Sequence, residues 1–485
     1  MHYLEALFIL SVLTVSAASA FSKRTPYGES RYTPWTIGMA LGGIFWFALI
    51  ATGRRSWRMD PAFVSVMAIF ILGLNDRSRR RKARLAADKN GIKNFTYAEP
   101  RLAVVGRRAL GALGLVLSVV SLAAALVFPV KDLPAPAGRY LVGTASFELV
   151  DDTRTGVYLD APGAPRRILA QAWYPADKNF SNESLPRSPW IADAPVADAY
   201  ADYVGLPHWI MSQLPLIMAN GRPGAPAAAD TGAMPVVIIS HGWTGTRAMH
   251  ADLAEELASR GFVAIAVDHP YGALSVSFAD GTVAPLHRGA LPDRDTTPEF
   301  GTFASTLVAT YAADIAAVAR SVRAGNTVPQ LSGRLDTARI ALAGHSTGGG
   351  AAVLAAMNDP GVLAVVGLDA WVEPIGNPRL AAGLPAPQLH IGSASWAGGI
   401  NAGYLATLKQ ASGAWAEYRI PGSSHFDFAM VRHVTSVGSW IGLAGKKDGF
   451  AFARTVTPLA CDWLEAIFRE GPDAAFAGLP VGDRE

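Results

Sequence analysis

Hydrophobic and polar residues are distributed differently in the N-terminal part of the chain and in the remainder. Four apolar stretches separated by short polar segments fill residues 1–130: Tyr3–Ala20, Trp35–Thr52, Pro61–Leu74 and Ala109–Phe128. About 20 apolar residues cross a bilayer as a helix, so the first, second and fourth stretches approach that length and the third is short. The pattern predicts an all-α transmembrane region at residues 1–130, with three or four spans.

The first apolar stretch has features of both a signal peptide and a membrane anchor. It ends in small residues, as a signal peptide does, but its start carries Glu5 and no Lys or Arg. A signal peptide normally begins with a positively charged segment. We therefore expect a retained anchor.

A cluster of positive charge lies between the third and fourth apolar stretches. Residues 75–108 hold 11 Lys and Arg against 3 Asp and Glu, whereas the whole chain carries a net charge of only +3. Short loops rich in Lys and Arg stay on the cytoplasmic side of a membrane, which predicts a cytoplasmic loop here and an extracytoplasmic C-terminal part. Binding to anionic lipid, without a role in topology, is the alternative. Because the excess charge is local, we expect no nucleic-acid partner.

A different pattern begins after segment 131–142, a Pro-containing stretch that we interpret as a linker. Short β-rich runs alternate with amphipathic or Ala-rich segments, which is typical of an α/β protein with a mainly parallel sheet. The predicted domain covers residues 143–470, with an insertion or cap at 180–231 and a flexible tail at 471–485. Predicted strands are 168–173, 235–240, 262–267, 339–343, 362–368, 388–391 and 416–420. Predicted helices are 248–259, 304–323, 347–357, 402–411 and 450–468.

The segment Gly344-His345-Ser346-Thr347-Gly348 stands between a predicted strand and a predicted helix. A G-x-S-x-G sequence in this context is typical of a nucleophile elbow, a sharp turn that exposes a strained serine. Glycine is required two positions before and after the serine, because a Cβ atom would collide in so tight a turn. The following helix directs its free N–H groups and positive dipole end at the serine oxygen. We therefore predict that Ser346 is a nucleophile.

A nucleophilic serine needs a histidine as base and a carboxylate that orients the histidine. Three carboxylates follow the serine before the strand predicted at 416–420: Asp359, Asp369 and Glu373. Asp359 lies in the sequence "NDPG", where Asp is normally a turn former. Asp369 closes a predicted strand at the sheet edge that also holds the elbow. We predict Asp369 as the acid, with Glu373 as the alternative.

Three histidines follow the predicted acid: His390, His425 and His433. Only His425 lies in a Gly/Ser loop, "PGSSHFDF", directly after a predicted strand, where a loop can hold the ring over the serine. His390 alternates within a strand and is expected to be a core residue, whereas His433 fits a helical or surface position. Asp427 is too close to His425 in sequence to orient its ring, so we expect it to be solvated. The predicted base is His425.

An acyl-transfer site also needs hydrogen-bond donors for the oxyanion. These are usually the backbone N–H after the nucleophile and one from a loop that follows an earlier strand. The segment "VVIISHGWTG" supplies that loop, so Thr347 and Trp243 are the predicted donors. His241 is expected to shape the loop by hydrogen bonding, with a role as a second base as the alternative.

Two groups of apolar residues are candidates for contact with substrate. Trp371, Phe426 and Phe428 flank the predicted catalytic positions and are candidates for an acyl pocket, although such aromatic residues more often form core. The apolar segment 204–218 is either a lid that dips into lipid or ordinary core.

Several motifs together resemble the isoform II type of platelet-activating-factor acetylhydrolase, within the α/β-hydrolase superfamily. They are "GHSTGG", "GLDAWVEP", "GSSHFDF", "SHGWTGTR" and "QAWYP", and the resemblance covers about residues 143–468. It implies an α/β-hydrolase fold and a metal-independent serine esterase, without a cofactor, that cleaves short or oxidised acyl chains from phospholipids. The chain departs from the family at "VDHPYG" (267–272), where a charged run is expected, and in its multi-span N-terminal region, which is foreign to the animal enzymes.

The sequence thus predicts a membrane-anchored serine esterase or lipase, with ester or phospholipid substrates and membrane lipid as its partners. One alternative is a carboxylesterase of the dienelactone-hydrolase or polyester-degrading kind that acts on soluble esters. The other is an inactive membrane scaffold. The single cysteine, Cys461, excludes an internal disulfide and a Cys-clustered zinc site.

Overall fold

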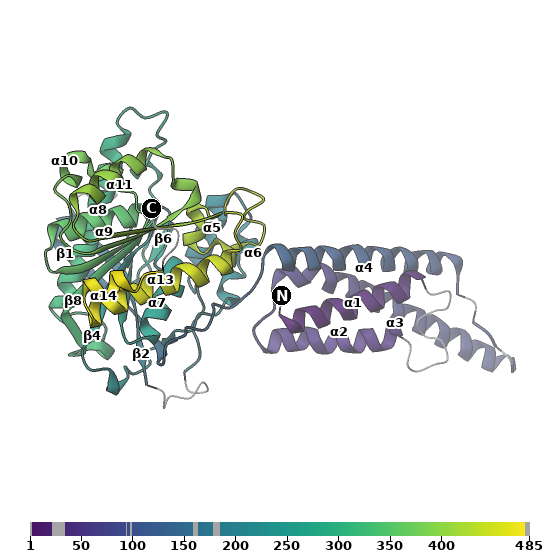
Figure 1. Ribbon diagram of the computed structural model, residues 1–485. Coiled ribbons are helices and arrows are strands. Elements are labelled where there is room, and N and C mark those ends of the chain that lie inside the picture. Colours follow the sequence, from purple (N-terminus) through teal and green to yellow (C-terminus); the bar gives the residue numbers. More distant parts are fainter. Residues whose placement is uncertain are drawn as a thin grey trace. The chain divides into compact units, whose positions relative to one another are not determined.

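The computed structural model describes residues 2–21, 34–93, 95–97, 99–158, 163–177 and 185–480. The chain forms two compact units, Met1–Lys131 and Asp132–Glu485. Figure 1 shows long helices in the first unit and a sheet covered by helices in the second.

The first unit packs long helices around an apolar core that includes Phe8, Val12 and Leu49. Ile44, Phe47 and Val116 are examples of apolar side chains that are exposed on the outside of the helices. Helices that are apolar on every side are typical of membrane spans. Three of the helices are long and apolar enough to cross a membrane, and α2 is apolar but shorter. The helices are α1 (Tyr3–Phe21), α2 (Pro34–Ala51), α3 (Asp60–Lys89) and α4 (Arg101–Val127).

The basic segment 75–108, predicted as a loop, is largely helical. Helix α3 continues to Lys89, and α4 already begins at Arg101. Arg, Lys, Ala and Leu dominate the second half of α3, and these residues favour helix. The chain leaves the helix at Gly91, whose φ is +73°. The third apolar stretch is therefore the first half of a 30-residue helix rather than an isolated short segment.

Glu5, the acidic residue at the start of α1, is buried in the bundle and forms an ion pair with Arg58, which is also buried. A second guanidinium nitrogen of Arg58 donates to the carbonyl oxygen of Phe128 at 2.9 Å. Removing one partner of a buried ion pair leaves an uncompensated charge, which is strongly destabilising. Helix α1 is thus tied to the rest of the bundle by charge as well as by packing.

The second unit is built on a nine-stranded sheet with the strand order β11-β10-β9-β8-β4-β5-β2-β1-β3. The six strands from β11 to β5 are parallel, and β2 lies antiparallel between β5 and β1. The central strands are continuous apolar runs because both of their faces are covered. The strands are β1 (Leu141–Thr155), β2 (Pro165–Ala176), β3 (Arg222–Pro223), β4 (Met234–Ser240), β5 (Val263–Asp268), β8 (Leu335–His345), β9 (Val362–Leu368), β10 (Gln388–Ser393) and β11 (Trp415–Ile420), with β6 (Ser275–Ser277) and β7 (Val283–Pro285) in a separate hairpin.

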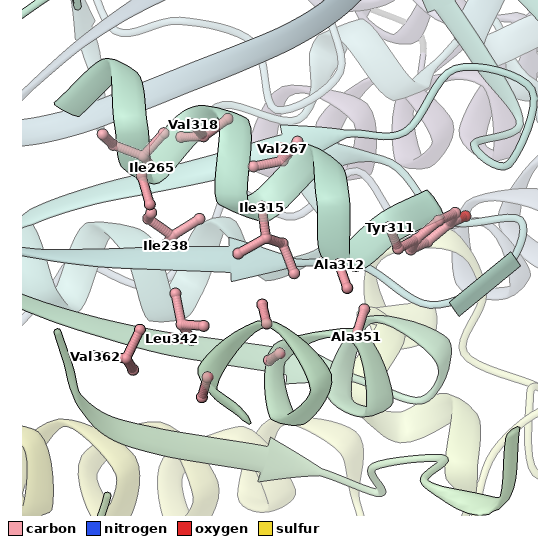
Figure 2. Close-up of a cluster of buried hydrophobic side chains, with 14 of the residues drawn as sticks. Ile238, Ile265, Val267, Tyr311, Ala312, Ile315, Val318, Leu342, Ala351 and Val362 are labelled. Carbon is pink, nitrogen blue, oxygen red and sulfur yellow. The ribbon is translucent and has the colours of Figure 1, made fainter. Parts of the chain in front are cut away.

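Helices cover both faces of this sheet. Helices α7 (Ala251–Ser259) and α13 (Gly449–Arg469) pack together on one face, and α8 (Phe300–Arg323) and α9 (Thr347–Asn358) pack together on the other. Figure 2 shows Ile315 of α8 directed toward side chains of the central strands, while Ala312 of α8 faces Ala351 of α9. Helix α8 is apolar enough to cross a membrane by length and composition, but its apolar face lies in this core. The other helices are α5 (Ala194–Val204), α6 (His208–Met211), α10 (Asn377–Leu380), α11 (Ile400–Ala411), α12 (Val431–Val434) and α14 (Pro472–Ala477).

Each strand and helix predicted for this unit matches an observed element within a few residues. Strand β1 was not predicted, and it begins inside the expected linker. The expected flexible tail at 471–485 is also partly wrong, because residues 472–477 form α14. Ala475 and Leu479 are buried there, and Phe476 contacts Trp463 edge-to-face. Within the expected insertion at 180–231, the described part holds α5 and α6, and residues 180–184 lie outside the described residues.

Candidate active site

Ser346 lies on a sharp turn between β8 and α9, with a φ of +54° and a ψ of −120°. A Cβ atom on Gly344 would lie 2.3 Å from the carbonyl oxygen of Gly348. On Gly348 it would lie 2.4 Å from the carbonyl oxygens of both Ser240 and His241. Real side chains do not make contacts this short, so both glycines are required by the backbone, as the sequence motif predicts.

Replacing Gly348 with alanine should therefore destabilise the protein by about 1–3 kcal/mol, because the new methyl group has only backbone to push against. The matched control is Gly403→Ala in α11, where no atom lies within 4 Å of the added Cβ. There alanine should be neutral or stabilising by up to about 1 kcal/mol, since it favours helix. Denaturant unfolding of the purified chain measures both changes, and equal stability of the two variants would contradict the steric argument.

Three side chains predicted from distant parts of the sequence meet at this turn. His425 begins the short helix His425–Ala429 after β11, and its Nε2 lies 2.9 Å from Ser346 Oγ. Its Nδ1 lies 3.0 Å from Oδ2 of Asp369, which directly follows β9. With Nδ1 donating to the carboxylate, Nε2 keeps a lone pair that accepts the serine proton. A general base needs this tautomer.

Asp369 is held in place from the neighbouring strand. The backbone N–H of Ser393 donates to Oδ1 at 2.6 Å, and the Ser393 hydroxyl donates to Oδ2 at 2.5 Å. The alternative acid, Glu373, is engaged elsewhere. It forms a two-bond ion pair with Arg294 at 2.8 Å and accepts a hydrogen bond from Trp371 Nε1. The hydrogen bonds from Arg294 lower the pKa of Glu373.

Trp396, which the sequence analysis did not identify, stacks on the His425 ring at 4.0 Å with an angle of 4° between the planes. Aromatic stacking of this kind contributes about 0.5–1.5 kcal/mol. Trp396→Ala should thus lower kcat by roughly 2- to 10-fold, since the imidazole then has more freedom to leave its position. Steady-state kinetics on a soluble ester measures this effect. Trp440→Ala, which removes a tryptophan that is 87% exposed, is the control and should leave kcat unchanged.

Ser346 faces a cavity of about 610 Å³. Both predicted oxyanion donors, Trp243 and Thr347, line this cavity, and Thr347 is the first residue of α9. His241 is buried, and its Nδ1 donates to the carbonyl oxygen of Gly242 at 2.7 Å. Burial holds the pKa of His241 well below its usual range, so the ring is neutral. This geometry supports a role in shaping the loop.

Aromatic residues form much of the cavity wall. Trp371 and Phe426 line it, but Phe428 does not. Phe426 is 41% exposed and Phe428 only 5%, because they point to different sides of the short helix His425–Ala429. Phe428 packs edge-to-face against Phe452, with ring centroids 4.9 Å apart. Further residues around the cavity are Tyr203, Leu291, Phe300, Trp396 and Ile400.

Segment 204–218 has both buried and exposed apolar side chains. Leu214 and Ile217 are fully buried and belong to the core, whereas Trp209 is 54% exposed.

The expectation that Asp427 is solvated was wrong, because its side chain is buried. It accepts hydrogen bonds from the backbone N–H groups of Ser424 at 2.7 Å and of Gly445 at 3.0 Å. It therefore fixes the loop that carries the histidine.

The strand order, the helices on both faces and the strained serine after β8 define an α/β-hydrolase. A ferulic acid esterase from Streptomyces cinnamoneus has a similar fold, with a TM-score of 0.57 and 22% identity, over 73% of this chain and 97% of that structure. The sequence profile of the platelet-activating factor acetylhydrolase, isoform II family matches residues 125–281 and 316–454, and the chain belongs to this family. The dienelactone hydrolase family also matches, over residues 223–373.

Curated relatives point to the same family. A probable 1-alkyl-2-acetylglycerophosphocholine esterase of Arthroderma benhamiae is 26% identical over 274 residues, which cover 54% of this chain and 65% of the relative. The platelet-activating factor acetylhydrolase of Bos taurus is 25% identical over 286 residues, covering 54% of this chain and 60% of the relative. The chain thus spans less than two thirds of the length of these relatives.

Proposed function

We propose that this protein is a carboxylic ester hydrolase that works through a catalytic triad of Ser346, His425 and Asp369. The observation that carries the proposal is the series of two hydrogen bonds, at 2.9 and 3.0 Å, that links the hydroxyl of the strained serine through the imidazole to a buried carboxylate. This chain of bonds is what acyl transfer needs, because the base must be in reach of the proton and must be held in one tautomer.

The proposed reaction has two halves. Ser346 Oγ attacks the ester carbonyl carbon while His425 Nε2 takes the hydroxyl proton. The backbone N–H groups of Trp243 and Thr347 then stabilise the negative oxygen. The C–O bond to the alcohol breaks, the alcohol leaves with the proton from His425, and an acyl-enzyme remains. A water molecule, deprotonated by the same histidine, attacks the acyl carbon and releases the carboxylic acid and free serine.

We propose short or oxidised acyl groups of phospholipids as the substrates. Membership of the family and the names of the relatives support this class of ester. The match to the dienelactone hydrolase family favours a second candidate, a carboxylesterase that acts on soluble esters. The inactive-scaffold alternative conflicts with the complete hydrogen-bond series at Ser346.

A substrate panel with the purified full chain separates these candidates. It compares a 2-acetyl phospholipid, a long-chain diacyl phospholipid, a p-nitrophenyl ester and a dienelactone. The proposal expects kcat/KM for the 2-acetyl phospholipid to exceed that for the long-chain phospholipid by at least roughly tenfold. Hydrolysis of the soluble esters alone would support the second candidate. If Ser346 failed to react with a fluorophosphonate probe, only the inactive-scaffold alternative would remain.

We also propose that the helices of the first unit anchor the chain in a membrane, with the basic half of α3 on the cytoplasmic side and the hydrolase unit on the other. Their length, composition and apolar outer surface support this arrangement.

The topology can be tested with single cysteines, because the native Cys461 is buried. Lys82→Cys lies in the basic half of α3, and Trp440→Cys replaces an exposed residue of the hydrolase unit. A membrane-impermeant maleimide applied to intact cells should label Trp440→Cys only. After lysis it should label both. The opposite pattern in intact cells would reverse the orientation.

A further inference from the structure

A second series of serine, histidine and aspartate lies beneath the loop that follows β4, far from solvent. Ser240 Oγ lies 2.8 Å from His269 Nε2, and His269 Nδ1 lies 3.0 Å from Asp314 Oδ2. These distances match those of the candidate triad, yet all three residues are 0% exposed. Because no substrate reaches Ser240, this series has a different role from the one at Ser346.

The charges around the second series fix its hydrogen atoms. Burial raises the pKa of Asp314, but the positive charge of Arg166 and the hydrogen bonds from Arg166 and His269 outweigh burial and hold it well below its usual range. The carboxylate also contacts Arg154 at 2.9 Å. Burial lowers the pKa of His269, so this ring is neutral. His269 therefore donates a hydrogen bond from Nδ1 to Asp314 and accepts a hydrogen bond from the Ser240 hydroxyl at Nε2.

The preceding residue, Asp268, binds the other end of the same loop. The backbone N–H of Arg247 donates to Asp268 Oδ1 at 2.6 Å, and its guanidinium forms an ion pair with Oδ2. Asp268 and His269 thus hold the two ends of the segment Ser240–Arg247, which we call the oxyanion loop. The backbone N–H of His269 also donates to Nε2 of His241, within that loop, at 3.3 Å.

The oxyanion loop contains one predicted donor and packs against the helix turn that contains the other. Trp243 lies within the loop, and the carbonyl oxygens of Ser240 and His241 lie against Gly348 in the first turn of α9. Thr347, the second donor, is the neighbour of Gly348 in that turn. A shift of the loop therefore changes the distance between the two N–H groups that face the oxyanion. The loop has little freedom of its own, since Thr244 has a φ of +61° and donates its N–H to the carbonyl oxygen of Gly272.

We propose that the adjacent residues Asp268 and His269 form a clamp that positions the oxyanion loop for the transition state of ester hydrolysis. They are positioning residues, since they touch neither the cavity nor the candidate triad. The inference rests on the proposed esterase function.

The first test variant, Ser240→Ala, removes the hydroxyl that is bound by His269 of the clamp. Its matched control is Ser259→Ala, which removes an equally buried hydroxyl at the end of α7. This hydroxyl donates to the backbone carbonyl oxygen of Glu256 and accepts a hydrogen bond from the backbone N–H of Gly138. A second variant, Arg247→Lys, loosens the opposite end of the loop at a less buried site and keeps the charge. All variants are full-length chains in detergent. The assay uses a p-nitrophenyl ester and a trifluoromethyl ketone, which forms a tetrahedral adduct that resembles the transition state.

The proposal expects Ser240→Ala and Arg247→Lys each to lower kcat by roughly 10- to 100-fold with KM within about threefold, since oxyanion donors act in the transition state. The inhibition constant of the ketone should rise by the same factor as kcat/KM falls. Loss of folded protein alone would reduce the number of active sites without changing this constant. Ser259→Ala should behave as wild type.

Hydrogen exchange of residues 241–247 separates the clamp from the proposed function. The clamp predicts faster exchange there in Ser240→Ala than in Ser259→Ala, whether or not the chain hydrolyses esters. Absence of wild-type activity on every ester would reject the esterase, and with it the catalytic part of the proposal. Unchanged exchange, or unchanged ketone inhibition in both loop variants, would overturn the clamp.

Discussion

Replacing Ser346 with alanine is expected to lower kcat/KM for ester hydrolysis by roughly 10⁴-fold or more. In the proposed mechanism the hydroxyl oxygen bonds to the acyl carbon, and it lies on a strained turn 2.9 Å from His425 Nε2. The fold should be unaffected, because alanine occupies the same backbone with one atom fewer.

The measurement is steady-state hydrolysis of a p-nitrophenyl ester by wild type and variant prepared in parallel. Ser305→Ala is the matched control, since this residue of α8 has an exposed hydroxyl that donates to the carbonyl oxygen of Pro374. The control should retain wild-type kcat/KM. Hydrolysis by Ser346→Ala at the wild-type rate would remove the serine from the mechanism.

Asp369→Asn should lower kcat by roughly 10³- to 10⁴-fold while leaving the shape of the site intact. An asparagine amide can donate to the imidazole, which favours the tautomer with a proton on Nε2, and that nitrogen then cannot take the serine proton. The neighbouring carboxylate supplies the control. Glu373→Gln removes the charge of the alternative acid, which binds Arg294 rather than His425.

The pair of variants decides which carboxylate supports the base. The structure predicts a large loss for Asp369→Asn and a change of only a few-fold for Glu373→Gln, measured at one pH with the same ester. Similar losses in both variants would mean that the two carboxylates share the role. A larger loss in Glu373→Gln would reverse the assignment of the acid.

The residues predicted from the sequence are those whose role depends on the local backbone, such as a sharp turn or the end of a strand. The elbow could be recognised because Gly344 and Gly348 are required by the turn itself, and Asp369 and His425 because each follows a predicted strand. Parallel strands end at the same edge of the sheet, so these loops were expected to meet there. The alternation of strands and helices likewise sufficed to predict the α/β fold.

Other features depend on contacts that no local pattern encodes. Ser393 binds the Asp369 carboxylate only because β10 lies beside β9, and Trp396 stacks on His425 only because the loop after β10 folds over the ring. Phe426 and Phe428 are the same residue type in the same short segment, and only the direction of each side chain decides which one lines the cavity. The basic half of α3 was not predicted as a helix because its charge suggested a loop, although its residues favour helix.

The proposed clamp residues lie in the segment "VDHPYG". The histidine of this segment had no role in the sequence analysis. The structure gives His269 two partners on its ring and places the neighbouring Asp268 against Arg247. Both roles require knowledge of which loops lie beside β5.

We propose that Ser346, activated by His425, forms a covalent bond to the acyl carbon. Its most direct test is peptide mass spectrometry after reaction of the full chain with a fluorophosphonate, for wild type and His425→Ala. We expect a single adduct on Ser346 in wild type, formed at least roughly 10³-fold more slowly in His425→Ala. An adduct on another residue, or equal rates for the two proteins, would contradict it.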